Sequence, residues 1–273
     1  MASPTPPTPP LADNLRALGL RRTAEDLADF LARATRSRWS PAVLLEELAR
    51  AEAQDRARRS LERRLARARL GRFKPMADFD WSWPKALDRA AVDRVLGLGF
   101  LEDSSNVILA GAQGLGKTMI ARNVAHQAVL QGHSVRSVTA AEMLLDLGAQ
   151  ETARALERRL RTYVKPRLLV VDEVGYLTYD TRAADLLFQV VSQRYERRSL
   201  LMTTNLAFKE WGTVFPNAAC VTALIDRLTH HAEIIAITGE SYRRREAEAL
   251  HKGRQPPAKD PEPADRSKRR ASS

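Results

Sequence analysis

The sequence is poor in cysteine and has no long apolar run. Cys220 is the only cysteine among 273 residues, which excludes an internal disulfide and a zinc site built from several cysteines. Such a low cysteine content is typical of proteins in the reducing cytoplasm. The opening residues, MASPTPPTPP, lack the basic start and apolar stretch of a secretory signal, and no apolar run reaches membrane-spanning length. We therefore expect a soluble, cytoplasmic protein with no membrane partner.

Acidic residues are in the minority. The chain has 44 Lys and Arg against 33 Asp and Glu, a formal net charge of +11. Such a surface attracts phosphate backbones, so nucleic acid is the first candidate partner. No segment resembles a base-reading module. We therefore expect double-stranded DNA to be recognised through its backbone and shape, with weak sequence preference.

Composition and pattern divide the chain into four parts. The first is rich in Pro and Thr, which favours an extended, disordered lead. The second has apolar residues at helical spacing and a predicted helix start at Ser40 and Pro41. A linker with aromatic and proline residues opens the third, and the last is rich in Pro, Lys, Arg and Ser. The expected parts are a disordered lead at 1–10, a helical domain at 11–72, a main domain with its linker at 73–250 and a disordered basic tail at 251–273.

Short apolar runs alternate with helical stretches in the third part. This alternation predicts an α/β fold with a parallel sheet and right-handed crossovers. The five predicted strands are NVILAG, SVRSVTA, RLLVVDE, SLLMTTN and EIIAITG.

The strongest motif is GAQGLGKT, residues 111–118, which directly follows the first predicted strand. It matches the phosphate-loop pattern of nucleotide-binding proteins. Its glycines let backbone amides face phosphate oxygens, Lys117 neutralises phosphate charge, and the Thr118 hydroxyl ligates Mg²⁺. The residues predicted here to bind ATP are Gly111, Ala112, Gln113, Gly114, Leu115, Gly116, Lys117, Thr118 and Met119.

Two further predicted strands end in polar residues at the same edge of the sheet. Asp172 and Glu173 end one buried strand, where ligands of open α/β sheets bind. We expect Asp172 to hold Mg²⁺ together with Thr118, and Glu173 to orient the attacking water. Asn205 follows the next strand and is placed to contact that water or the γ-phosphate, although Asn also commonly forms turns. Lys117, Glu173 and Asn205 are therefore the expected catalytic residues.

These motifs carry a resemblance to a known family, as do four further segments. The segments are GYL after Asp172, ADLLFQVVSQRYERRS, TTNLAFKEWGTVF and IDRLTHHAEIIAITGESYR. From about Leu11 to Ala247 the chain resembles the IstB-like transposition helper ATPases, a branch of the AAA+ proteins similar to the helicase loader DnaC. The resemblance implies an AAA+ P-loop fold behind a small all-α N-terminal domain. It also implies an ATP-dependent homo-oligomer that grips target DNA and engages a cognate transposase.

The family's motif also implies two arginine roles. Arg227 matches the arginine finger, which acts in trans on the γ-phosphate held by a neighbouring subunit, and a guanidinium suits this chemistry. From the residues alone, Arg227 is a surface arginine beside Asp226. Arg243 lies where related ATPases carry a second sensor arginine that binds nucleotide, but Arg244 and Arg245 compete for the assignment. The phosphate loop departs from the family's usual prolines and threonine at positions that contribute mainly backbone amides.

Two basic segments are candidates for the DNA contact, and the sequence does not choose between them. One is the stretch from Arg56 to Lys74, in which acidic partners are scarce. The other precedes the Asp172 strand. Their arginines are Arg56, Arg58, Arg59, Arg63, Arg64, Arg67, Arg69 and Arg72 in the first, and Arg154, Arg158, Arg159 and Arg161 in the second.

The remaining aromatic and histidine residues have less specific interpretations. Trp81 and Trp83 either stack on adenine or join the linker to the ATPase domain, the more common role. His230 and His231 are adjacent and have no third ligand nearby in the sequence, so we expect no transition metal.

Two other functions share these features. A replicative helicase loader has the same ATP site and basic surfaces but a helicase client. A nucleotide-dependent DNA-binding switch assembles with ATP and hydrolyses little, although a water-orienting Glu173 argues against it.

Overall fold

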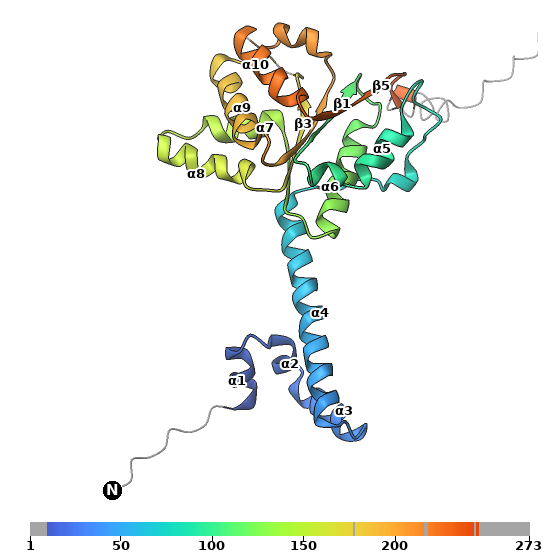
Figure 1. Ribbon diagram of the computed structural model, residues 1–273, viewed down its shortest axis with the longest axis vertical. Helices are drawn as coiled ribbons and strands as arrows, with labels where there is room; N and C mark the ends of the chain where they lie inside the picture. The colour runs from blue at the N-terminus through green and yellow to red at the C-terminus, as the bar shows by residue number, and fades with distance from the viewer. Residues whose placement is uncertain (1–9, 177, 216–217, 243, 246–273) are drawn as a thin grey trace, which may run out of the picture.

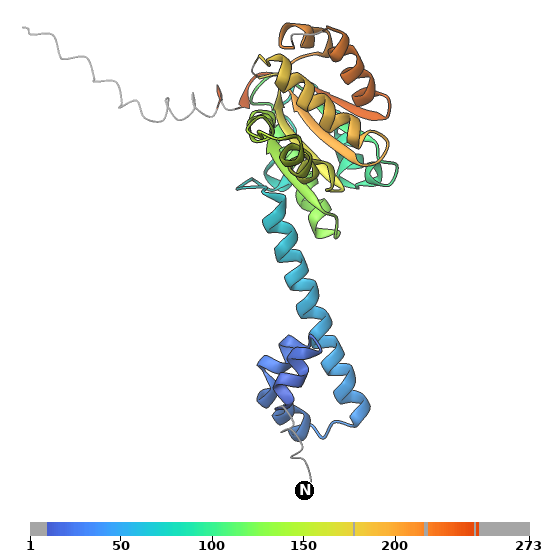
Figure 2. The same ribbon diagram turned by 90° about the vertical axis from the view of Figure 1, so that its left-hand side faces the viewer.

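The computed structural model describes residues 10–176, 178–215, 218–242 and 244–245. The molecule is elongated (Figure 1), with an α/β unit at one end and three short helices at the other. One long helix, α4 (Pro41–Ala68), joins the two ends, and the perpendicular view in Figure 2 shows the same separation. Most of the predicted lead and all of the predicted tail lie outside the described residues.

The long helix begins where the sequence predicts. The Ser40 hydroxyl accepts a hydrogen bond from the Val43 N–H at 3.3 Å, and Pro41 occupies the first turn. The helix ends at Ala68, and the C-cap residue Arg69 has a left-handed backbone. Its 28 residues correspond to about 42 Å of helix. Before it come α1 (Leu11–Ala17), α2 (Arg21–Glu25) and α3 (Leu27–Arg36).

The α/β unit contains one sheet in the order β2-β3-β4-β1-β5, and every neighbouring pair is parallel. The predicted five-stranded parallel sheet is therefore confirmed. The strands are β1 (Asn106–Gly111), β2 (Val135–Thr139), β3 (Leu168–Val174), β4 (Ser199–Thr204) and β5 (Ala232–Ile237).

Helices cover both faces of the sheet, because alternate strand residues point to opposite faces. Val107 and Leu109 pack in one cluster with α5 (Arg89–Leu96) and α6 (Lys117–Leu130). Ile108 packs in the other with the remaining helices. These are α7 (Ala140–Gly148), α8 (Ala153–Val164), α9 (Thr181–Arg194) and α10 (Ala218–Thr229), together with the short η3 (Phe208–Thr213). The short η1 (Met76–Asp78) and η2 (Gly99–Leu101) pack with α5 and α6 instead.

The end of α4 is anchored to the α/β unit. Ala68 and Leu70 are buried in the α5 and α6 cluster, and Arg64 donates to the Val129 carbonyl at 3.2 Å. Within the described residues, every helix is too short or too polar to cross a bilayer.

Candidate nucleotide site

The phosphate loop joins β1 to α6, as the sequence predicts. Gly111, Gly114 and Gly116 all have positive φ angles, of 156°, 76° and 89°, which glycine adopts readily. A Cβ at Gly114 would lie 2.1 Å from the Ser241 hydroxyl, and one at Gly116 would lie 2.5 Å from the Phe79 ring. The loop therefore needs glycine for its backbone shape and for its close packing. It presents the N-terminus of α6, where backbone N–H groups favour an anion.

Lys117 begins α6 and bends back over the loop. Its ammonium donates to the carbonyls of Gly111 at 2.6 Å and Ala112 at 2.7 Å. These contacts hold the charge over the loop, where phosphate charge needs to be neutralised.

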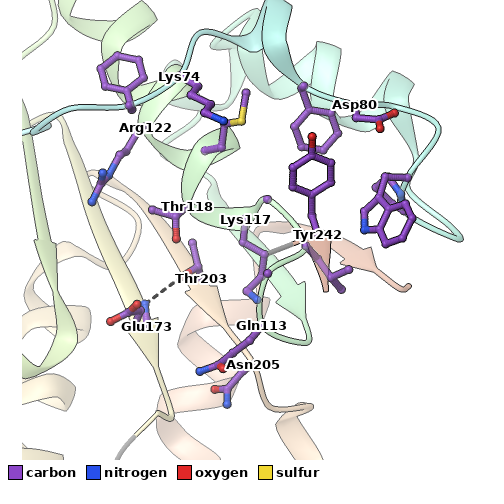
Figure 3. A pocket seen from close by; sticks show the side chains of 18 of the residues that line it. Lys74, Asp80, Gln113, Lys117, Thr118, Arg122, Glu173, Thr203, Asn205 and Tyr242 are labelled. Atoms are coloured by element: carbon purple, nitrogen blue, oxygen red, sulfur yellow. Dashed lines mark hydrogen bonds between the residues drawn. The ribbon is translucent and has the colours of Figure 1, made fainter. Parts of the chain in front are cut away.

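A hydrogen-bonded network lies beside the loop, at the carboxyl ends of β3 and β4. The Thr118 hydroxyl donates to Asp172 Oδ1 at 3.1 Å, and the Thr203 hydroxyl donates to the same oxygen. Thr203 also accepts from the Glu173 N–H at 2.9 Å. Figure 3 shows Thr118, Thr203 and Glu173 gathered beside Lys117. Asp172 is buried, whereas Glu173 is exposed, so the two carboxylates have different surroundings.

A hollow of about 370 Å³ opens over these groups. The side-chain oxygen of Asn205 is buried and has no hydrogen-bond partner among the described residues. A buried polar atom without a partner is costly unless a ligand or water satisfies it, so this oxygen is available to a bound molecule. Of the predicted site residues, those that line the hollow are Gln113, Gly114, Leu115, Gly116, Lys117, Thr118, Met119, Glu173 and Asn205.

The linker forms the opposite wall of the hollow, where the sequence offered only Trp81 and Trp83 as candidates for stacking on adenine. Phe79 packs against the loop at Gly116, and Trp83 donates its indole N–H to the Glu240 carbonyl at 2.8 Å. Tyr242 donates its N–H to the Gly114 carbonyl at 3.0 Å. The linker and the segment after β5 are thus joined across the loop. The aromatic linker composition was the signal for this wall. Its lining residues are Phe73, Lys74, Asp78, Phe79, Asp80, Trp83 and Pro84, with Arg122, Tyr176 and Tyr242 from elsewhere.

The two linker tryptophans have different positions. Trp83 lines the hollow and packs edge-on against Tyr242, with ring centroids 6.1 Å apart. Trp81 instead packs on Phe79 at 4.8 Å, beneath the guanidinium of Arg89. Trp83 therefore joins two segments, and because it borders the hollow it stays a candidate for stacking on adenine, whereas Trp81 does not line the hollow.

Comparison with known proteins identifies the nucleotide. The model of the family described as IstB-like ATP binding protein matches residues 13–249. The chain belongs to this IstB-like family. ATP is therefore the nucleotide that this chain binds. The predicted fold class, an AAA+ P-loop unit with five parallel strands behind a helical part, is confirmed by the sheet and by this match.

Individual relatives cover most of the chain. An insertion sequence IS21 putative ATP-binding protein of Pseudomonas aeruginosa is 38% identical over 70% of this chain and 72% of its own. An IS5376 putative ATP-binding protein of Geobacillus stearothermophilus is 34% identical over 74% of this chain and 80% of its own. Among solved structures, DnaI aligns with a TM-score of 0.49 and 20% identity, over 61% of this chain and 89% of that chain.

Of the two predicted arginines of this IstB-like protein, Arg227 is not among the described residues that line the hollow. Arg227 lies on α10 with its guanidinium 4.5 Å from the centre of the Phe188 ring. Its buried Nη1 has no hydrogen-bond partner within the described part of the chain. Arg243 lies outside the described residues.

The structure corrects one premise about the adjacent histidines. His230 and His231 do have a third candidate ligand, Glu196, and one ligand atom of each lies within 4.8 Å of the others. The sequence missed it because Glu196 comes from the segment after α9 and meets the histidines only through folding. The Tyr195 hydroxyl lies 2.6 Å from His230 Nδ1, which gives this nitrogen a protein partner. The absence of a transition metal stays a prediction.

Proposed function

We propose that this IstB-like protein hydrolyses ATP with Mg²⁺, assembles with copies of itself on double-stranded DNA and assists a transposase. The observation that carries hydrolysis is the shared Asp172 oxygen, which binds the hydroxyls of Thr118 and Thr203 while Glu173 faces the hollow. The printed names of the relatives, insertion sequence ATP-binding proteins, support the transposition role.

The proposed chemistry follows from the groups at the hollow. The loop amides and Lys117 bind the phosphates. Thr118 and Asp172 supply the hard oxygen donors that Mg²⁺ prefers, and they lie 3.1 Å apart, so the residues fit this ion. When bound, Mg²⁺ neutralises charge on the phosphate oxygens. Glu173 orients and polarises the attacking water, and Asn205 hydrogen-bonds the water or the γ-phosphate.

Arg227 is proposed to complete the site of a neighbouring copy. Arg227 is not among the described residues that line the hollow of its own chain. Its Nη1 also has no hydrogen-bond partner within the described residues. Hydrolysis then requires assembly. Arg243 remains a proposed second sensor. We also propose that residues 11–72 form a helical domain and residues 73–250 the ATPase domain, with a lead at 1–10 and a basic tail at 251–273.

The test measures the ATPase rate and particle size against added duplex DNA, for the wild type and for Arg227→Ala. We expect DNA to raise both in the wild type, and Arg227→Ala to bind ATP without turning it over. Arg50→Ala is the matched control, since Arg50 is exposed and paired with Glu47. If DNA changes neither quantity, the DNA role is wrong and a protein client such as a helicase becomes the better explanation.

A mixing experiment isolates the in-trans role. Arg227→Ala retains an intact phosphate loop, and Glu173→Gln retains the arginine. Each variant alone should be inactive, whereas their mixture should regain activity at interfaces that combine both intact halves. A mixture as inactive as its components would remove Arg227 from the neighbouring site.

A further inference from the structure

The arginines of α4 lie on two faces that differ in electrostatic character. On one face, Arg58 donates to Asp55 at 2.7 Å and to Glu62 at 2.9 Å. Its charge is therefore matched by carboxylates. Arg64 is also engaged, since it donates to Ser60 at 2.7 Å and to the Val129 carbonyl. The sequence makes both arginines candidates for DNA contact. Because their guanidinium groups already have partners in the protein, they are poorly placed to bind a phosphate.

The other face keeps most of its positive charge. Arg56, Arg59, Arg63 and Arg67 recur at spacings of three and four, which places them on one side of a helix. Arg56, Arg63 and Arg67 are exposed and have no acidic partner among the described residues. They extend over about 16 Å of helix, so this stripe is long enough to contact more than one phosphate of a duplex.

One end of the stripe forms a concave site. A hollow of about 410 Å³ is lined by Gly19, Arg21, Arg56, Arg59 and Arg63. Gly19 lies in the turn between α1 and α2 and has a φ of 78°. A Cβ at Gly19 would lie 4.0 Å from the Arg56 guanidinium, so the turn approaches the stripe closely. We name this hollow the arginine cup.

One arginine of the cup is held in place by a carboxylate. Arg59 contacts Asp55 Oδ2 at 2.6 Å, and Asp55 is only 8% exposed. A hydrogen bond from Arg58, reinforced by the charge of Arg59, lowers the pKa of Asp55, which keeps this carboxylate ionised. Asp55 thus orients Arg59 while Arg21, Arg56 and Arg63 remain unmatched within the described chain. Three converging unmatched guanidinium groups favour an anion.

We propose that the arginine cup binds a backbone phosphate of double-stranded DNA. This inference rests on the proposed DNA role and assigns part of the contact to the N-terminal helices. Guanidinium forks match the oxygens of a phosphate in a bidentate way, and the stripe continues beyond the cup to Arg67, as an extended polyanion requires. On α8, two of the four candidate arginines are paired, Arg159 with Asp146 and Arg161 with Glu157, which leaves only Arg154 and Arg158 for a phosphate.

The experiment measures duplex affinity as a function of salt for the full chain, by fluorescence anisotropy. The variants are Arg63→Gln, Arg56→Gln/Arg63→Gln and the control Arg50→Gln, which removes the same charge from the Glu47-paired side of α4. Each lost phosphate contact should reduce the slope of log affinity against log salt by about one. Because the cup holds one phosphate, we expect a slope smaller by about one and affinity lower by roughly tenfold for the double variant, with Arg50→Gln unchanged. ATP binding and the unfolding midpoint check that each variant folds.

Several outcomes overturn the assignment. A double variant with the wild-type slope removes the cup from the DNA contact while leaving the proposed function intact. If the slope is unchanged but wild-type binding of inorganic phosphate is lost in the variant, the cup holds a free anion instead. If only poly-L-glutamate binding is lost, the cup serves an acidic protein segment. A wild type that does not bind duplex DNA refutes the proposed DNA role itself.

Discussion

Thr203 on β4 donates its hydroxyl hydrogen to Asp172 on β3. The same hydroxyl accepts the Glu173 N–H, at a point where the register between the two strands shifts, between Val171 and Val174. Glu173 has a φ of 63°, which a non-glycine residue rarely adopts. Thr203 therefore supplies the acceptor for a backbone N–H in the irregular part of the strand pairing. This single side chain links the position of Asp172 to the backbone conformation of Glu173.

We predict that Thr203→Val slows ATP hydrolysis more than it weakens ATP binding. The variant keeps the shape but removes the donor to Asp172 and the acceptor for the Glu173 N–H. Hydrogen bonds to charged groups contribute about 1.5–3 kcal/mol, so kcat should fall by roughly ten- to a hundredfold. Steady-state kinetics and equilibrium nucleotide binding separate the two effects. Thr203→Ser retains the hydroxyl and should recover most of the rate; a valine variant with wild-type kcat would contradict the role.

Glu173→Gln should bind ATP and DNA but trap the assembly. The amide keeps the size of the carboxylate and cannot polarise a water in the same way, so kcat should fall by at least about a hundredfold. Nucleotide-binding affinity and particle size with ATP are the measurements.

Lys117→Ala is the contrasting variant. It should lose ATP binding, and with it assembly, because the phosphate charge is no longer neutralised. Rapid turnover by Glu173→Gln would remove Glu173 from the mechanism, and unchanged ATP affinity in Lys117→Ala would contradict the role of the loop.

The sequence predicts best those segments whose residue pattern reflects both their burial and the position of their functional groups. The strand LLVVDE is apolar because it is buried on both faces, and its carboxylates follow at the edge where ligands bind. What the sequence could not provide depends on contacts between distant segments. Trp83 meets the Glu240 carbonyl across 157 positions, and no periodicity indicates such a pairing. The aromatic linker was therefore predicted as packed, with adenine stacking as the alternative for its tryptophans, but its contact with the segment after β5 was not predicted.

The charge of α4 shows a second limit. The number of arginines predicts a basic helix, but it does not distinguish arginines that are paired with carboxylates from those that are available to DNA. Helical spacing separates the face with Arg58 from the face with Arg63, and only the folded chain brings the Gly19 turn against the latter. Glu196 beside His230 is a similar case, since the two meet only through packing of the segment after α9.

Alkaline pH should destabilise the protein through Tyr163. Burial, together with the hydrogen bond that Tyr163 donates to Asp146, raises the pKa of this phenol to about 12 from a usual 10.0. The folded state therefore favours the neutral phenol. Its contribution is fully present below pH 10 and is lost as pH rises from about 10 to about 12, with an upper limit of roughly 2 to 3 kcal/mol.

The measurement compares wild type and Tyr163→Phe by urea unfolding at several pH values. The difference in unfolding free energy should be constant below pH 10 and should shrink above it. A phenolate absorbance titration should also show one tyrosine with a midpoint near 12 that disappears in the variant. A difference independent of pH would show that Tyr163 ionises normally in the folded protein.

Arg194 should be a major stabilising residue of the α/β unit although it is distant in sequence from every predicted site residue. It is 1% exposed and burial lowers its pKa to about 9. Its guanidinium donates to carbonyls at the end of α8, in the connection to β3 and at the start of β4. These carbonyls belong to Tyr163, Val164, Pro166, Arg167 and Ser199.

Arg194→Met should therefore lower the free energy of unfolding by about 3–5 kcal/mol, because it leaves several buried carbonyls unsatisfied. Arg194→Lys should be intermediate, since an ammonium has a compact set of donors and cannot span carbonyls on two elements. Arg197→Met removes an exposed arginine three positions away and should change stability by less than about 0.5 kcal/mol. Urea unfolding of the three variants measures these differences in the free energy of unfolding. If Arg194→Met and Arg197→Met unfold at the same midpoint, the carbonyls must find other partners and the guanidinium is dispensable for the fold.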